Sequence, residues 1–93
     1  MRFFDWNAEK NAWLKKVRGV TFNDVVFHIS TGNLLDVLRH NNPEKYPDQK
    51  IFVVAMDEYV YLVPFIESRD GIFLKTIIPS RKMTKQYLRK KKQ

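Results

Sequence analysis

The feature that most restricts the fold is a pair of apolar segments, residues 51–56 and 59–63, with only Asp57 and Glu58 between them. Both segments are rich in β-branched and aromatic residues, which favour strands. Two polar residues between two such segments are typical of a tight β-hairpin. A third apolar segment, residues 72–78, follows a turn-forming sequence and predicts another strand. The second half of the chain is therefore expected to form an antiparallel sheet of three to four strands.

Two helices are expected ahead of this sheet. Asn7 is a suitable N-cap for a helix that runs to about Arg18, where Gly19 supplies the stop. Thr21 caps a second helix, and Asp24, three residues later, completes a capping box. The apolar residues of the second helix recur at the spacing of one buried face, and they are Phe22, Val25, Val26 and Ile29.

The remaining segments are less strongly patterned. The aromatic residues 3–6 favour a short strand, and residues 34–40 suit either a strand or a short helix. Trp13 and Val17 lie four residues apart and predict a buried stripe on the first helix. Pro64 removes a backbone donor, which predicts a bulge or a free edge in the second hairpin strand.

A last helix is expected to begin at Arg81, after the capping residue Ser80. Only Met83, Tyr87 and Leu88 are apolar enough to attach this helix to the body. The whole pattern is α+β: a short N-terminal strand, two helices, an antiparallel sheet and a C-terminal basic helix.

Length and composition place this pattern in one intracellular domain. The 93 residues suffice for a single core, so we expect one domain over residues 1–93. The chain has no cysteine, which favours a reducing compartment and excludes thiolate zinc sites. No apolar run approaches the roughly 20 residues of a membrane helix. Asp5 and Glu9 interrupt the segment where a signal peptide needs an apolar core. We therefore expect a cytoplasmic protein without a membrane partner.

The positive charge is concentrated at one end of the chain. The formal net charge is +7, yet the cations and acids of residues 1–80 cancel. The excess lies in residues 81–93, which carry no acid and which we expect to form a basic helix or tail. Such an asymmetry indicates a polyanionic partner and says nothing about the fold.

Three segments resemble the BrnT family of bacterial ribonuclease toxins. Residues 6–11 (W-N-A-E-K-N) and 19–22 (G-V-T-F) resemble the opening motifs of the family at the same spacing. Residues 50–52 (K-I-F) resemble its basic entry to the sheet, although an Arg is usual where Lys50 stands. Residues 78–85 (I-P-S-R-K-M-T-K) resemble its I-S-A-R-K-A-T-K segment.

The resemblance implies a RelE-like fold and the toxin role in a type II toxin–antitoxin pair. The implied activity is cleavage of RNA, including mRNA on the ribosome, which inhibits translation and growth. The implied partner is a cognate antitoxin with a DNA-binding domain, in a hetero-oligomer with the toxin.

Cleavage of RNA without a metal or other cofactor needs a proton acceptor, a proton donor and cations around the phosphate. Arg81 stands at a predicted strand–helix junction, and Lys50 at the entry to a strand that could bring both together. His40 precedes a polar loop and is better placed than His28 to act as the base. The predicted catalytic residues are therefore Arg81, Lys50 and His40. The predicted RNA-binding residues are Lys10, Lys15, Lys16, Arg18, Lys82, Lys85 and Arg89.

The same residues allow other interpretations. The cations at strand ends can be ordinary solvated charges, and Asp57 and Glu58 are better explained as turn residues than as a catalytic pair. The chain could bind RNA or the ribosome without cleaving it. It could also be a protein-interaction module whose basic end binds an acidic partner.

Overall fold

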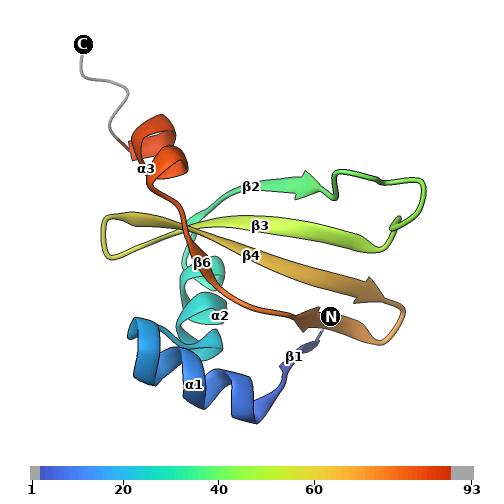
Figure 1. The fold of residues 1–93 in the computed structure, drawn as a ribbon, viewed down its shortest axis with the longest axis horizontal. Coiled ribbons are helices and arrows are strands. Elements are labelled where there is room, and N and C mark those ends of the chain that lie inside the picture. Colours follow the sequence, from blue (N-terminus) through green and yellow to red (C-terminus); the bar gives the residue numbers. More distant parts are fainter. Residues whose placement is uncertain (1–2, 89–93) are drawn as a thin grey trace.

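The chain forms one mixed β-sheet with helices on both sides (Figure 1). The computed structural model describes residues 3–88. In chain order the elements are β1 (Phe3–Trp6), α1 (Ala8–Arg18), α2 (Phe22–Ser30), β2 (Leu34–Arg39), β3 (Gln49–Met56), β4 (Tyr59–Ser68), β5 (Gly71–Leu74), β6 (Ile78–Pro79) and α3 (Arg81–Leu88). The predicted α+β class and order of elements are confirmed, and residues 34–39 form a strand.

The sheet is larger than the predicted three to four strands. Its order is β1-β5-β4-β3-β2, and β6 pairs with β4 beside that path. All pairs are antiparallel except β1 with β5, which is parallel. The predicted strand at residues 72–78 is interrupted at residues 75–77, and its two parts pair with different ends of β4. The ten-residue strand β4 is thus the central strand of the sheet.

Pro64 lies where the partner of β4 changes. One edge of β4 pairs with β6 at Tyr61 and Leu62, and with β5 from Phe65 onward. The Pro64 carbonyl accepts a 2.8 Å hydrogen bond from the Lys75 N–H in the gap. The N and O atoms of one strand residue point to the same edge, so the donor that proline lacks would face this gap. Neither a bulge nor a free edge is observed: β4 keeps its register with β3 at Pro64, and on its other edge the gap between β6 and β5 is bridged by the Lys75 N–H bond.

The predicted helix caps are confirmed. The Asn7 side chain accepts a 2.9 Å bond from the Lys10 N–H, and Gly19 ends α1 in the left-handed region at φ 73°. The Thr21 hydroxyl accepts from the Asp24 N–H at 3.1 Å, and the Asp24 carboxylate accepts from the Thr21 N–H at 2.9 Å. These local bonds set the bounds of both helices.

The predicted buried face of α2 is also confirmed, because Phe22 and Val25 are fully buried in the core between the helices and the sheet. The prediction for α1 is wrong. Trp13 is 44 % exposed and Val17 56 % exposed, and Leu14 is the buried residue of the helix. The Asn11 side chain accepts a 2.7 Å hydrogen bond from the Phe22 N–H. This bond between α1 and the start of α2 places the Leu14 side of α1 toward the core.

Helix α3 lies on the opposite side of the strands from α1 and α2 (Figure 1). The predicted Ser80 cap is present, with its hydroxyl accepting a 3.1 Å bond from the Met83 N–H. Thr84, which the sequence analysis did not single out, is the fully buried residue of α3. Tyr87 donates a 3.1 Å hydrogen bond to Asp36, whereas Leu88 is exposed. No helix within residues 3–88 is long and apolar enough to span a membrane.

Candidate functional site

His40 is held in a defined orientation at the end of β2. Its N–H donates a 3.2 Å bond to the Gln49 carbonyl, which continues the β2–β3 ladder by one residue. Its ring packs on Tyr46 with the ring centroids 4.4 Å apart. Its Nδ1 accepts a 3.0 Å bond from the Asn42 N–H. A neutral imidazole that accepts at Nδ1 carries its proton at Nε2, so the free side of this ring is a hydrogen-bond donor.

A hollow of about 260 Å³ opens beside this histidine. Its lining residues are His40, Asn41, Gln49, Lys50, Ile51, Pro64, Phe65 and Lys75. Lys75 comes from the interruption between β5 and β6 and is exposed. The hollow therefore brings together a histidine and a lysine from segments 35 residues apart in the sequence.

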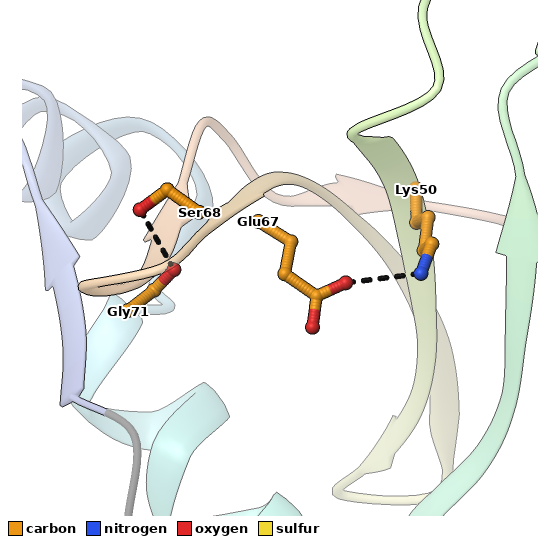
Figure 2. A network of polar contacts seen from close by, with 4 residues as sticks. All are labelled: Lys50, Glu67, Ser68 and Gly71. Carbon is orange, nitrogen blue, oxygen red and sulfur yellow. Dashed lines mark hydrogen bonds and ion pairs between the residues drawn. The ribbon is translucent and has the colours of Figure 1, made fainter.

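Lys50 lies at the same end of the sheet, but its ammonium points elsewhere. Its Nζ is 2.9 Å from Oε1 of Glu67 on β4, and the two side chains are 35 % and 29 % exposed (Figure 2). Lys50 is paired with Phe65, a residue of the core under α1 and α2. Side chains alternate along a strand, so the Lys50 ammonium and the His40 ring lie on opposite faces of the sheet.

Lys50 and Arg81 do not come together as predicted. Lys50 is opposite Phe65, whereas Arg81 follows β6, which pairs with β4 at Tyr61 and Leu62. At about 3.3 Å per strand residue, those places on β4 are roughly 10 Å or more apart. Arg81 also lies on the α3 side of the sheet, while the Lys50–Glu67 pair lies on the other.

The cations of α3 form a single basic surface. Arg81, Lys82 and Lys85 are exposed and lie within about 100° of one another around the helix axis. Thr84 and Tyr87, which contact the sheet, lie on the other side of the helix. We call Arg81, Lys82 and Lys85 the α3 basic surface. The predicted RNA-binding residue Arg89 lies outside the described residues.

The cations of α1 are arranged differently. The Lys10 ammonium lies 4.7 Å and the Arg18 guanidinium 5.5 Å from the centre of the Trp13 ring. The Arg18 guanidinium also donates a hydrogen bond to the Ile77 carbonyl, so it connects α1 to the segment between β5 and β6. Lys15 and Lys16 are exposed. The basic residues therefore form two surfaces, α1 on one side of the sheet and α3 on the other.

A larger hollow, of about 480 Å³, lies at the opposite end of β3. It is lined by His28, Asn33, Ala55, Asp57, Glu58 and Leu88. Asp57 and Glu58 have φ values of 53° and 65°, which confirms them as residues of a tight turn. Their carboxylates make this hollow unsuitable for a polyanion. Within residues 3–88, no group of three or more His, Asp or Glu side chains is arranged to hold a metal ion.

Lys75, Tyr46 and Glu67 were not predicted as site residues. Their positions depend on how β3, β4 and β5 pair, and local pattern carries little information on pairing register. A lysine in the middle of the apolar segment 72–78 was the one available signal for Lys75.

Comparison with known proteins gives no significant match to a family model, to a curated protein or to a solved structure. What is established is a small α+β fold with a mixed sheet, a hollow holding His40 and Lys75, and two separate basic surfaces.

Proposed function

We propose that this protein is an RNA-cleaving toxin of the BrnT type, with a RelE-like fold, held inactive by an antitoxin. The observation that carries the proposal is the hollow that both His40, with its oriented ring, and Lys75 line. The resemblance of residues 6–11, 19–22, 50–52 and 78–85 to that family supports the toxin class.

The roles follow from the geometry of the hollow. In the proposed reaction the 2′-oxygen bonds to the phosphorus as its proton passes to water, and the bond from the phosphorus to the 5′-oxygen breaks. The Nε2–H of His40 donates a hydrogen bond to the leaving 5′-oxygen, which takes its proton from water, and Lys75 stabilises the negative charge that develops on the phosphate. His40 in this orientation is a donor, which differs from the base expected from the sequence. Arg81, Lys82 and Lys85 bind neighbouring phosphates of the same RNA. Lys75 bonds β4 at Pro64, and Ser80, which precedes α3, bonds β4 at Val60. These two places on β4 are about 13 Å apart, so the α3 basic surface lies near the hollow.

RNA cleavage by purified variants tests this proposal. His40→Gln is expected to lower the cleavage rate by about 100-fold, the usual range for loss of an oriented donor at a developing negative charge, because glutamine lacks the ring nitrogen that accepts from the Asn42 N–H. Lys75→Gln is expected to lower it as well. Arg69→Gln, an exposed cation in the β4–β5 turn, is the matched control and should cleave like the original chain. Growth inhibition should follow the same order. Full cleavage by both His40→Gln and Lys75→Gln, with the fold intact by circular dichroism, would reject the site.

A second candidate is an RNA-binding module without cleavage. The observation in its favour is the Asn42 N–H bond at Nδ1, which leaves a neutral His40 ring without a free nitrogen lone pair to accept a proton. Under this candidate the chain binds a labelled RNA in a salt-dependent way, and no cleavage product forms with any substrate. The same gel assay therefore separates the two candidates.

The proposed antitoxin can be sought in the adjacent reading frame. Co-expression of the chain with a neighbouring frame encoding a DNA-binding protein should relieve growth inhibition and yield a hetero-oligomer. If no adjacent product relieves it, the toxin–antitoxin assignment fails.

A further inference from the structure

Helix α1 exposes apolar surface that the fold itself does not use. Of its eleven residues only Leu14 is fully buried. Trp13 and Val17, four residues apart, are neighbours on the helix and are 44 % and 56 % exposed. Tryptophan is usually among the well-buried residues, and short helices depend on packing for stability. We call Trp13 and Val17 the α1 apolar strip.

The surroundings of the strip are strongly positive. Helix α1 carries four cations and one acid, which are Lys10, Lys15, Lys16, Arg18 and Glu9. Lys10 and Arg18 lie against the Trp13 ring itself, at 4.7 and 5.5 Å from its centre. An occupant of the strip therefore meets an indole and a valine side chain within a rim of four cations and one acid, Glu9, which lies four residues before Trp13.

We propose that the α1 apolar strip docks an acidic segment of a partner protein that inserts an apolar side chain between Trp13 and Val17. Carboxylates of that segment pair with Lys10 and with Lys16, and its apolar side chains cover the strip. A partner segment that is helical, with apolar side chains at positions i and i+4, would fit the α1 apolar strip. The strip lies on the opposite side of the sheet from the α3 basic surface, so partner and RNA occupy separate sides.

Charge and shape favour this occupant over the two others. A second copy of the chain would bring one α1 against another, which opposes four cations to four cations. An RNA base that stacks on the indole competes with Lys10 and Arg18 for the ring, and it gains nothing from the aliphatic Val17. An acidic, apolar protein segment satisfies both the cations and the valine.

The inference rests on the proposed function only where the partner is taken to be the antitoxin. The docking surface can be tested without that identity. The probe is a labelled synthetic peptide of about 18 residues, built from Glu and Leu with Leu at i, i+3, i+4 and i+7. A second peptide with every Leu replaced by Gln keeps the charge and removes the apolar face. Binding of both to the full chain is followed by fluorescence anisotropy.

The Leu peptide is expected to bind, and the Gln peptide to bind much more weakly. Trp13→Ala and Val17→Ser should each weaken binding of the Leu peptide, with about a tenfold loss for Trp13→Ala, as for a buried aromatic anchor. Phe27→Ala is the matched control, because Phe27 is 60 % exposed on α2 and lies outside the strip. Lys16→Gln should weaken binding more than Lys45→Gln does.

Four results with the peptides or in light scattering would overturn the inference. They are failure of the Leu peptide to bind, equal binding of the two peptides, unchanged binding by Trp13→Ala, and a Trp13-dependent dimer of the chain in light scattering. Loss of oligoribonucleotide binding in Trp13→Ala would assign the strip to RNA and also reject a protein occupant. The RNA cleavage assay does not depend on any of these results, so failure of the proposed function and failure of this inference are distinguishable.

Discussion

The Thr84 hydroxyl accepts a 2.8 Å hydrogen bond from the Val60 N–H and donates a 2.7 Å bond to the Ser80 carbonyl. Val60 stands near the start of β4, and its carbonyl accepts in turn from the Ser80 N–H at 2.9 Å. One buried hydroxyl thus connects the first turn of α3 to the central strand. This connection holds a helix whose basic first turn is unfavourable for the helix dipole.

Replacing this hydroxyl should loosen α3. Thr84→Val keeps the shape of the side chain but leaves the buried Val60 N–H without an acceptor. We expect a loss of about 1–3 kcal/mol in the free energy of unfolding, measured by urea denaturation. Thr76→Val, whose hydroxyl makes no hydrogen bond to any residue within 3–88, should change it by less. Equal effects of the two substitutions would show that the Val60 bond contributes nothing specific.

Because of the contact between Tyr87 and Asp36, the free energy of unfolding should fall at high pH. Desolvation, the hydrogen bond to Asp36 and the charge of Asp36 raise the pKa of Tyr87 above its ordinary value of 10.0. The unfolded chain therefore loses the Tyr87 proton first as pH rises. The free energy of unfolding should fall above about pH 10, as linkage requires. Unfolding titrations of Tyr87→Phe should show a shallower fall; an unchanged profile would contradict this assignment.

If the chain binds RNA as proposed, the α3 basic surface should determine much of the salt dependence of that binding. Each phosphate contact to a single strand adds about −0.7 to the slope of log K against log salt concentration. Replacing Arg81, Lys82 and Lys85 together by Gln should therefore make the slope shallower by about 2. Filter binding between low and moderate salt measures it. Arg69→Gln serves as the control and should leave the slope unchanged, and a triple variant with the original slope would exclude α3 from the RNA surface.

Gly71 should not accept a side chain. It pairs with Phe3 in the parallel β1–β5 ladder, and a Cβ atom there would lie 2.5 Å from the Phe3 carbonyl oxygen. Gly71→Ala should cost about 1–3 kcal/mol, as overpacking does, and loosen β1. Trp6 on β1 stacks on Phe22, so acrylamide quenching of tryptophan should increase. Unchanged stability and quenching would mean that β1 can move away from the added Cβ atom at no cost.

The parts of the fold that were predictable from the sequence are those set by local bonds. Asn7 and Thr21 define helix starts because their side chains bond backbone groups three residues away. Asp57 and Glu58 define a turn because both adopt the positive φ that a two-residue hairpin requires.

The parts that were not predictable depend on distant segments. The spacing of Trp13 and Val17 shows that they share a side of α1, but the contact of Asn11 with the start of α2 decides which side is buried. The strand number was underestimated because β4 accepts two partners along one edge. The separation of Lys50 from Arg81 likewise depends on pairing register, so the candidate site shifted from that pair to His40 and Lys75.

The parallel pairing of β1 with β5 has a consequence for how the chain folds during synthesis. Phe3 pairs with Gly71, and most of the sequence lies between them. Strand β1 therefore has no partner until β5 has left the ribosome. Closing so long a loop is slow, and an emerging chain must wait with β1 unpaired. A chain with this order of assembly acquires its complete sheet, and the hollow formed with Lys75, only after most of its residues have been translated.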